Sequence, residues 1–203
     1  MIRTIIFDMG KVLIPFDFQL GYNRIAELAG CEASAVPERL RQYDSVQRFE
    51  SGAIEPRAFV DEINQILGTN YDYDVFCEIW SSIFLTDTLI PESLLEALHR
   101  RYRLVLLSNT NAIHFPMVRE RYPILNHFDA FVLSHEVGAM KPSPKMYEAA
   151  VAAAQCRPEE CFFTDDIAEY VEGAKQYGID AVRFESAEQI ERELTDRGVD
   201  WQE

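Results

Sequence analysis

The chain has 203 residues, of which 48% are hydrophobic, so it can bury a sizeable core as one large domain or as one domain that carries an insertion. Its 34 acidic and 19 basic residues give a formal net charge of −15, which argues against nucleic acid and anionic membranes as partners. The four cysteines form no C-x-x-C pair and have no adjacent histidine, which argues against a zinc site or a disulfide framework.

The amino-terminal residues enter a predicted strand directly, without a leader-like segment, and no apolar run reaches membrane-spanning length. We therefore expect a cytoplasmic protein that has no membrane partner. Nothing in the sequence indicates an obligate protein partner.

A short β-branched and aromatic run opens the chain and predicts a strand buried on both faces. The run ends at Asp8, and Gly10 follows two residues later. Ligands of open α/β sheets bind where the carboxyl ends of the strands meet, so Asp8 is a candidate catalytic carboxylate. The same two residues also fit a simple turn.

After Ile14 the apolar spacing changes to the helical period and keeps it for roughly 70 residues. Four short helices are expected there, bounded by residues that favour helix starts and ends, such as Pro56 and Gly68. They cover about 22–29, a segment after Ser34, 56–67 and 75–84. We predict that residues 16–86 form an inserted four-helix cap.

From residue 91 onward, helical and strand patterns alternate. Helices are expected over 93–101, 143–155, 168–177 and 186–197, and strands over 104–107, 129–133, 161–164 and 181–184. Such crossovers predict an α/β fold with a doubly wound, Rossmann-like parallel sheet. Residues 1–15 and 87–203 would form this core domain.

The predicted strand ends carry polar residues that suit a phosphate and a divalent cation. Asp8, Asp165 and Asp166 would repel one another unless a hard cation such as Mg²⁺ lay between them. Ser108 and Asn109 offer a hydroxyl and backbone N–H groups to phosphate oxygens. Lys141 supplies a compact positive charge from a loop before a helix. Each residue alone also fits a turn, a helix cap or a solvated loop, but four such edge loops together favour a site.

Four segments in this order resemble the motifs of the haloacid dehalogenase superfamily, in the branch with a helical cap after the first motif. The segments are IIFDMGKVL, LLSNTN, the lysine of GAMKPSP, and FFTDDIAEYVEGAKQYGI. The resemblance covers essentially the whole chain. It is nearest in character to the bacterial α-D-glucose-1-phosphate phosphatases and to the phosphatase domains of epoxide hydrolases.

This resemblance implies a magnesium-dependent phosphatase that acts on a small phosphorylated metabolite. Asp8 would be the nucleophile and form an aspartyl-phosphate that water hydrolyses. Mg²⁺ would be held by Asp8, Asp166 and the Gly10 carbonyl, with Asp165 behind them. The residues that would bind the transferred phosphoryl group are Ser108, Asn109, Thr110 and Lys141. The cap would enclose the site and select the substrate, without supplying a motif residue.

The sequence departs from the family pattern at two positions. Gly10 stands where these phosphatases usually carry a second Asp that acts as general acid and base, and Tyr170 stands where Asp or Asn is common. Without that acid, the reaction should favour good leaving groups, so a sugar 1-phosphate is the expected substrate. His114 or Asp17 is an alternative acid, and Glu169 is a possible replacement near Tyr170.

Two other functions stay open at this point. Metal-free haloacid dehalogenases also lack the second Asp, although the Asp165-Asp166 pair speaks against this reading. A non-catalytic protein that binds a phosphorylated ligand is the alternative from another class, and Gly10 and Tyr170 are its support.

Overall fold

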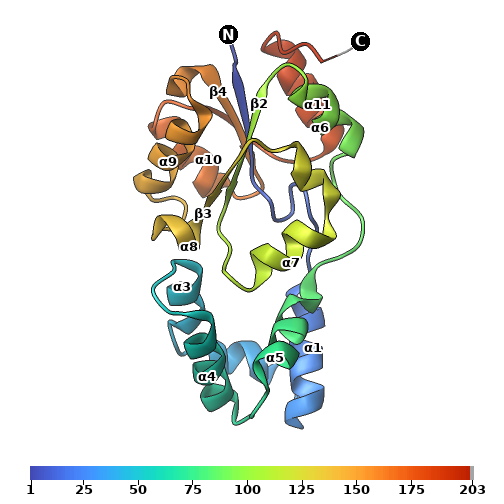
Figure 1. Ribbon diagram of the computed structural model, residues 1–203, viewed down its shortest axis with the longest axis vertical. Helices are drawn as coiled ribbons and strands as arrows, with labels where there is room; N and C mark the ends of the chain where they lie inside the picture. The colour runs from blue at the N-terminus through green and yellow to red at the C-terminus, as the bar shows by residue number, and fades with distance from the viewer. Residues whose placement is uncertain (202–203) are drawn as a thin grey trace.

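The computed structural model describes residues 1–201, which form an α/β fold around one sheet (Figure 1). In these residues the sheet has the strand order β3-β2-β1-β4-β5, and every neighbouring pair is parallel. The strands are β1 (Thr4–Phe7), β2 (Arg103–Ser108), β3 (Ala130–Leu133), β4 (Cys161–Asp165) and β5 (Asp180–Arg183). The predicted parallel, doubly wound sheet is confirmed. Positions 202 and 203 of the predicted core range lie outside the described residues.

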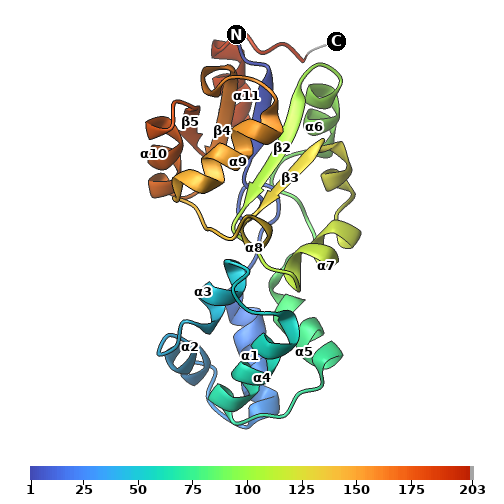
Figure 2. The ribbon, with the colours of Figure 1, turned by 60° about the vertical axis from the view of Figure 1, so that its left-hand side comes forward.

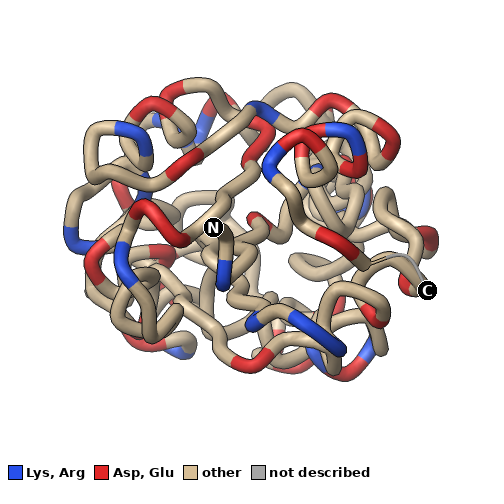
Figure 3. Tube along the Cα trace, turned by 90° about the horizontal axis from the view of Figure 1, so that it is seen from above, with Lys and Arg blue, Asp and Glu red and all other residues tan. Residues whose placement is uncertain are grey.

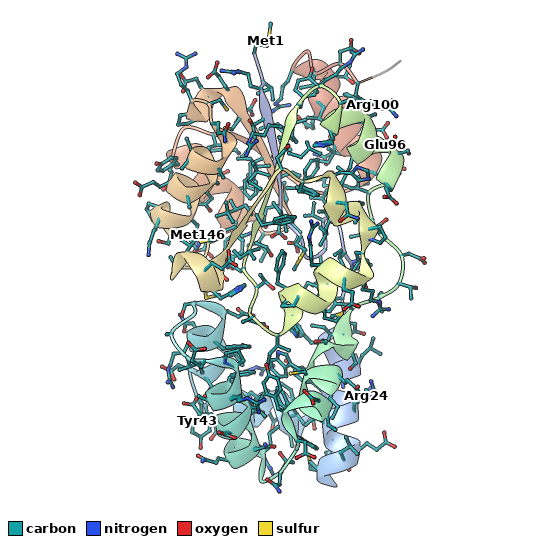
Figure 4. All side chains as sticks on the ribbon, viewed as in Figure 1. Met1, Arg24, Tyr43, Glu96, Arg100 and Met146 are labelled. Atoms are coloured by element: carbon teal, nitrogen blue, oxygen red, sulfur yellow. The ribbon has the colours of Figure 1, made fainter. Side chains whose placement is uncertain are left out.

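Helices cover both faces of the sheet because alternate strand residues point to opposite sides (Figures 1 and 2). Ile5 and Phe7 pack with α6 (Glu92–His99), α7 (His114–Arg121) and α11 (Ala187–Asp196). On the other face, Ile6 packs with α9 (Pro144–Ala154) and α10 (Ala168–Gln176). The remaining elements are the short α8 (Ser134–Val137) and the 3-10 turns η2 (Pro123–His127) and η3 (Pro158–Glu160). Figure 4 shows side chains filling these layers, with Met146 on α9.

The segment of residues 16–86 lies beyond the carboxyl edge of the sheet (Figures 1 and 2). It contains α1 (Phe18–Ala29), α2 (Ala35–Leu40), α3 (Ser45–Glu50), α4 (Pro56–Leu67), α5 (Tyr73–Trp80) and the 3-10 turn η1 (Ser81–Ile83). These helices share a core of their own, built on residues such as Phe49, Phe59 and Phe76. We call residues 16–86 the helical segment.

Helix α3 is the difference from the four helices expected in this segment. It is six residues long, and its N-cap residue Asp44 makes no side-chain capping hydrogen bond, so local interactions give it little support. Tertiary packing holds it instead, because the Phe49 ring stacks on Phe59 with centroids 4.2 Å apart.

The helical segment is connected to the sheet by two stretches of chain that lie side by side. Phe16 and Phe84 form an antiparallel bridge. On either side of it, Asp17 N–H donates to Ile83 O at 2.9 Å and Leu85 N–H donates to Pro15 O at 3.0 Å. The chain therefore enters and leaves the segment at one place.

Acidic and basic residues are intermixed along the chain. In Figure 3 acidic positions are spread around the outline, with basic positions between them. None of the helices described in residues 1–201 has the length and apolar character to cross a membrane. The cytoplasmic location stays a prediction.

Candidate active site

Asp8 lies at the end of β1, the central strand of the sheet, and its N–H donates to Thr164 O on β4 at 3.0 Å. All strands run the same way, so the loops after β2, β3 and β4 converge on this edge. These loops bring Asn109, Lys141 and Asp165 to Asp8. The helical segment faces the same edge (Figure 1).

Lys141 joins two of the predicted carboxylates. Its Nζ donates to Asp8 Oδ1 at 2.5 Å, to Asp165 Oδ2 at 2.6 Å and to the Leu107 carbonyl at 3.0 Å, and all of these groups are buried. Burial alone would lower the pKa of Lys141, but the two carboxylates outweigh it and raise that pKa above its usual range. Burial raises the pKa of Asp8 to about 7, and Asp165 adds to this rise while Lys141 opposes it. One ammonium thus offsets only part of the negative charge of two buried carboxylates.

Asp166 completes a cluster of three carboxylates whose oxygens lie within 4.8 Å of one another. Both Asp165 oxygens already have partners, since Oδ1 accepts from Ile167 N at 2.9 Å and Oδ2 accepts from Lys141. Asp166 is half-buried, and burial together with Asp165 raises its pKa. An all-oxygen cluster with excess negative charge fits a hard divalent cation. Asp8 and Asp166 are the members best placed to ligate it, with Asp165 supporting them.

Gly10 offers a carbonyl but leaves no room for a side chain. In residues 1–201 the Gly10 carbonyl oxygen accepts no hydrogen bond, which leaves it available to a cation. A Cβ atom on Gly10 would lie 2.7 Å from Phe16 Cε1. The Lys11 ammonium lies 5.2 Å from the centroid of the same ring. The Phe16 ring therefore takes the space that a side chain at position 10 would need.

The Asn109 side chain holds the Lys141 loop in place. Its Oδ1 accepts from Lys141 N at 2.8 Å and its Nδ2 donates to Lys141 O at 3.2 Å. The same Nδ2 donates to the Tyr170 hydroxyl at 3.4 Å. Asn109 lines the cavity described below, but its amide is already engaged in positioning Lys141.

Ser108 and Thr110 occupy different places around the same loop. Ser108 is buried, does not line the cavity, and its hydroxyl donates to Asn109 O at 3.4 Å. Thr110 lines the cavity, and its Oγ1 is buried without a hydrogen-bond partner. An unpaired buried hydroxyl at a cavity wall is available to a phosphate oxygen. Thr110 is thus better placed for that contact than Ser108.

A cavity of about 600 Å³ separates this cluster from the helical segment. Asp8, Lys141 and Asp166 form part of its floor. The opposite wall comes from the helical segment and is largely aromatic and aliphatic, with residues that include Phe18, Tyr22, Ile25, Leu40 and Trp80. Such a space can enclose a small organic phosphate.

Tyr170 packs against the lysine where the family often carries an acidic or amide residue. The Lys141 ammonium lies 5.2 Å from the centroid of its ring, and Tyr147 OH donates to the Tyr170 backbone carbonyl at 2.7 Å. Glu169 is exposed and does not line the cavity. It therefore does not take the place of a carboxylate at position 170.

His114 and Asp17 do not serve as the missing acid in this structure. His114 Nε2 donates to Trp80 O at 3.0 Å, and Nδ1 accepts from Asn111 Nδ2 at 3.2 Å, so both ring nitrogens are engaged in the neutral form. Burial lowers the pKa of His114 to about 4. Asp17 lies outside the cavity lining and accepts from Gln19 N at 2.8 Å as the N-cap of α1.

Glu50, the last residue of α3, is a cavity residue that sequence reasoning missed. Burial raises its pKa to about 7. It belongs to no motif, and α3 is too short to show a clear helical period. No sequence pattern used above would have found it.

Comparisons with known proteins show the family of this chain. Residues 2–178 match the family model of haloacid dehalogenase-like hydrolases. The chain is 24% identical to a D-ribitol-5-phosphate phosphatase of Bacteroides thetaiotaomicron, over 96% of this chain and 98% of that protein. The resemblance to glucose-1-phosphate phosphatases stays a prediction.

Solved structures of other proteins share the fold of this chain. A haloacid dehalogenase family enzyme of Bacteroides thetaiotaomicron, in complex with magnesium and inorganic phosphate, is 26% identical, with a TM-score of 0.80 over 92% of this chain and 96% of that one. An L-2-haloacid dehalogenase of Xanthobacter autotrophicus is 20% identical and shares the fold, with a TM-score of 0.64 over 98% of this chain and 85% of that one. The family match covers most of the chain, and the solved relatives share its fold. The chain belongs to the haloacid dehalogenase-like hydrolases.

Proposed function

We propose that this protein is a magnesium-dependent phosphatase that hydrolyses a small phosphate monoester through an aspartyl-phosphate on Asp8. One observation carries the proposal: Asp8 shares the buried Lys141 ammonium with Asp165, and an Asp166 oxygen lies within 4.8 Å of both carboxylates. The phosphatase name of one relative and the magnesium and phosphate in a solved neighbour support it.

In the proposed reaction, an Asp8 oxygen attacks the phosphorus in line with the departing oxygen. Lys141 stabilises the negative charge that builds up on the phosphoryl oxygens, and the Thr110 hydroxyl donates a hydrogen bond to one of them. Asp8, Asp166 and the Gly10 carbonyl would hold Mg²⁺, which supplies further positive charge to the phosphoryl group when bound. Asn109 and Asp165 keep Lys141 in position for both steps.

The helical segment, residues 16–86, is proposed to be the cap of this enzyme, and residues 1–15 and 87–203 its core domain. The aromatic wall that it adds to the cavity would enclose the substrate and select it. A cavity of about 600 Å³ suits a phosphosugar or a sugar-alcohol phosphate.

Within that class, two substrates have separate support. The lack of a carboxyl at Gly10 favours a sugar 1-phosphate, because its anomeric oxygen leaves more readily than an ordinary alcohol. The relative named a D-ribitol-5-phosphate phosphatase favours a sugar-alcohol 5-phosphate. A phosphate-release panel that contains both kinds of ester decides between them.

Phosphate release from 4-nitrophenyl phosphate with Mg²⁺ or with EDTA tests the proposal itself. Wild-type protein should release phosphate only when Mg²⁺ is present. Asp8→Asn should release none, while its thermal unfolding stays cooperative. Wild-type rates in Asp8→Asn would overturn the assignment of the nucleophile.

The same assay separates the two functions left open by the sequence. Chloride release from 2-chloropropionate without metal would identify a dehalogenase. Binding of inorganic phosphate without turnover of any ester would identify a non-catalytic binding protein.

A further inference from the structure

The proposed phosphatase lacks a proton donor in the place where its family usually has one. At Gly10 the Phe16 ring occupies the necessary space, and His114 and Asp17 are engaged in other hydrogen bonds. The carboxyls that line the cavity are those of Asp8, Asp44, Glu50, Asp165 and Asp166. Three of these form the cluster at the sheet edge, which leaves two residues of the helical segment.

Asp44 and Glu50 differ in their surroundings. Asp44 is exposed to solvent and forms an ion pair with Arg48, whose guanidinium lies 3.6 Å away. In the described part of the chain, the Glu50 carboxyl has no hydrogen bond and no ion pair. An unpaired carboxyl in a partly closed apolar cavity is stable as the neutral acid, and burial accordingly raises the pKa of Glu50 to about 7.

The backbone at Glu50 is fixed to the loops that carry the site. Ser134 Oγ donates to Glu50 O at 2.5 Å and also contacts the backbone of Thr110, accepting from its N–H at 2.9 Å. Two residues later, a Cβ on Gly52 would lie 2.0 Å from His135 O, so the chain after α3 touches α8 directly. These contacts tie the end of α3 to the core and hold Glu50 at the cavity.

Glu50 and Tyr170 line the same cavity as Asp8. Burial is the main cause that raises the pKa of the Tyr170 hydroxyl. The ring of Tyr170 contacts the Lys141 ammonium, which in turn binds Asp8. Glu50 thus belongs to the part of the cavity wall that the helical segment supplies, across the same cavity from Asp8 and Lys141, and a departing alcohol would lie in the space between them.

We propose that Glu50 is the general acid and base of the reaction, presented to the substrate by the helical segment. This inference rests on the proposed phosphatase function. In the first step, Asp8 forms a bond to phosphorus, the bond from phosphorus to the alcohol oxygen breaks, and Glu50 gives that oxygen its proton. In the second step, the Glu50 carboxylate takes a proton from the water that attacks the aspartyl-phosphate. Phosphate leaves, and both carboxyl groups return to their starting states.

A general acid at Glu50 widens the range of phosphate esters that the enzyme can hydrolyse. Protonation of the leaving oxygen matters most when the alcohol has a high pKa and forms an unstable anion, as in a sugar-alcohol 5-phosphate. The preference for sugar 1-phosphates that Gly10 alone would impose is then relieved.

The test compares kcat/KM across phosphate esters whose leaving groups range from 4-nitrophenol to simple alcohols. Wild-type activity should depend weakly on the leaving-group pKa. Glu50→Gln should lose about a hundredfold to ten-thousandfold with alkyl phosphates, and less than tenfold with 4-nitrophenyl phosphate. Glu55→Gln, which alters an exposed glutamate at the start of α4, is the matched control and should behave as wild type.

A uniform loss across all esters in Glu50→Gln would overturn the inference, because a merely structural role affects every substrate alike. Glu50→Asp guards against misfolding: it should keep a shallow dependence on the leaving group, and a slope as steep as that of Glu50→Gln would also count against Glu50. If wild-type protein hydrolyses no ester with Mg²⁺, it is the proposed function that fails. If wild type is active and Glu50→Gln matches it on alkyl phosphates, only the inference fails.

Discussion

Gly10 and Phe16 form a complementary pair: a Cβ on Gly10 would lie 2.7 Å from Phe16 Cε1, well inside van der Waals contact. The ring has further edge contacts with Phe18 and Phe84, at centroid distances of 4.9 and 6.2 Å. It cannot move aside without disturbing the junction with the helical segment. The absence of a carboxyl at position 10 is therefore built into the packing.

We predict that Gly10→Asp alone destabilises the protein by about 1–3 kcal/mol, the usual cost of overpacking. Adding Phe16→Ala removes the clash, so the double variant should be more stable than the sum of the two single changes implies. Urea unfolding of the four proteins in this cycle measures the coupling. Additive effects would show that the ring gives way without cost.

Replacement of Lys141 should lower the stability of the folded protein. Lys141→Met leaves Asp8 and Asp165 buried without a counter-charge, which should cost about 3–5 kcal/mol of unfolding free energy in EDTA. Mg²⁺ should restore part of this loss, because a cation between the carboxylates replaces the missing charge. Urea midpoints with and without Mg²⁺ provide the measurement. Lys145→Met, on the exposed start of α9, is the control and should change neither midpoint.

Asp166→Ala should raise the magnesium concentration needed for half-maximal activity by at least tenfold, because it removes a predicted oxygen ligand. Glu169→Ala is the matched control, since that carboxyl is exposed and outside the cavity. A metal titration of phosphate release compares the two variants. The predicted metal site is wrong if Asp166→Ala and Glu169→Ala give the same titration curve.

Acid should weaken the contact that His114 makes between the sheet domain and Trp80. Its pKa is lowered to about 4 in the folded protein, so folding is penalised once the unfolded chain binds a proton near pH 6.5. The contribution of neutral His114 to the free energy of unfolding is fully present above pH 6.5. It decreases as the pH drops to about 4, by about 3 kcal/mol in all. The difference in unfolding free energy between wild type and His114→Gln should shrink over that range. A constant difference would mean that His114 does not titrate there.

Much of the fold followed from local patterns that have a direct physical cause. The buried run before Asp8, the alternation of helix and strand after residue 91, and the glycines that end α1 and α4 in the left-handed conformation all appear at or near the predicted places. The strand-end loops of a parallel sheet converge on one edge, so the sequence alone predicts that Asp8, Lys141 and Asp165 lie together.

The features that sequence reasoning missed are those set by contacts between distant residues. Helix α3 depends on Phe49 stacking against Phe59, and its last residue reaches the site through Ser134, far along the chain. Ser108 is buried and is not among the residues that line the cavity, and its predicted contact with the phosphate stays a prediction. The direction of a side chain after a strand depends on its neighbours in three dimensions, and single-sequence periodicity does not contain that information.

Pro15 and Leu85, joined by a backbone hydrogen bond of 3.0 Å, have an implication for how such enzymes diversify. Because the chain departs and returns at one point, the stretch between them can be exchanged as a cassette of any length without shifting the register of a strand. A recombination event there would replace the substrate-selecting wall and leave the phosphate-handling residues in place. With Glu50 inside the cassette, the exchange would also bring or remove the proton donor, so specificity and leaving-group range would be inherited together.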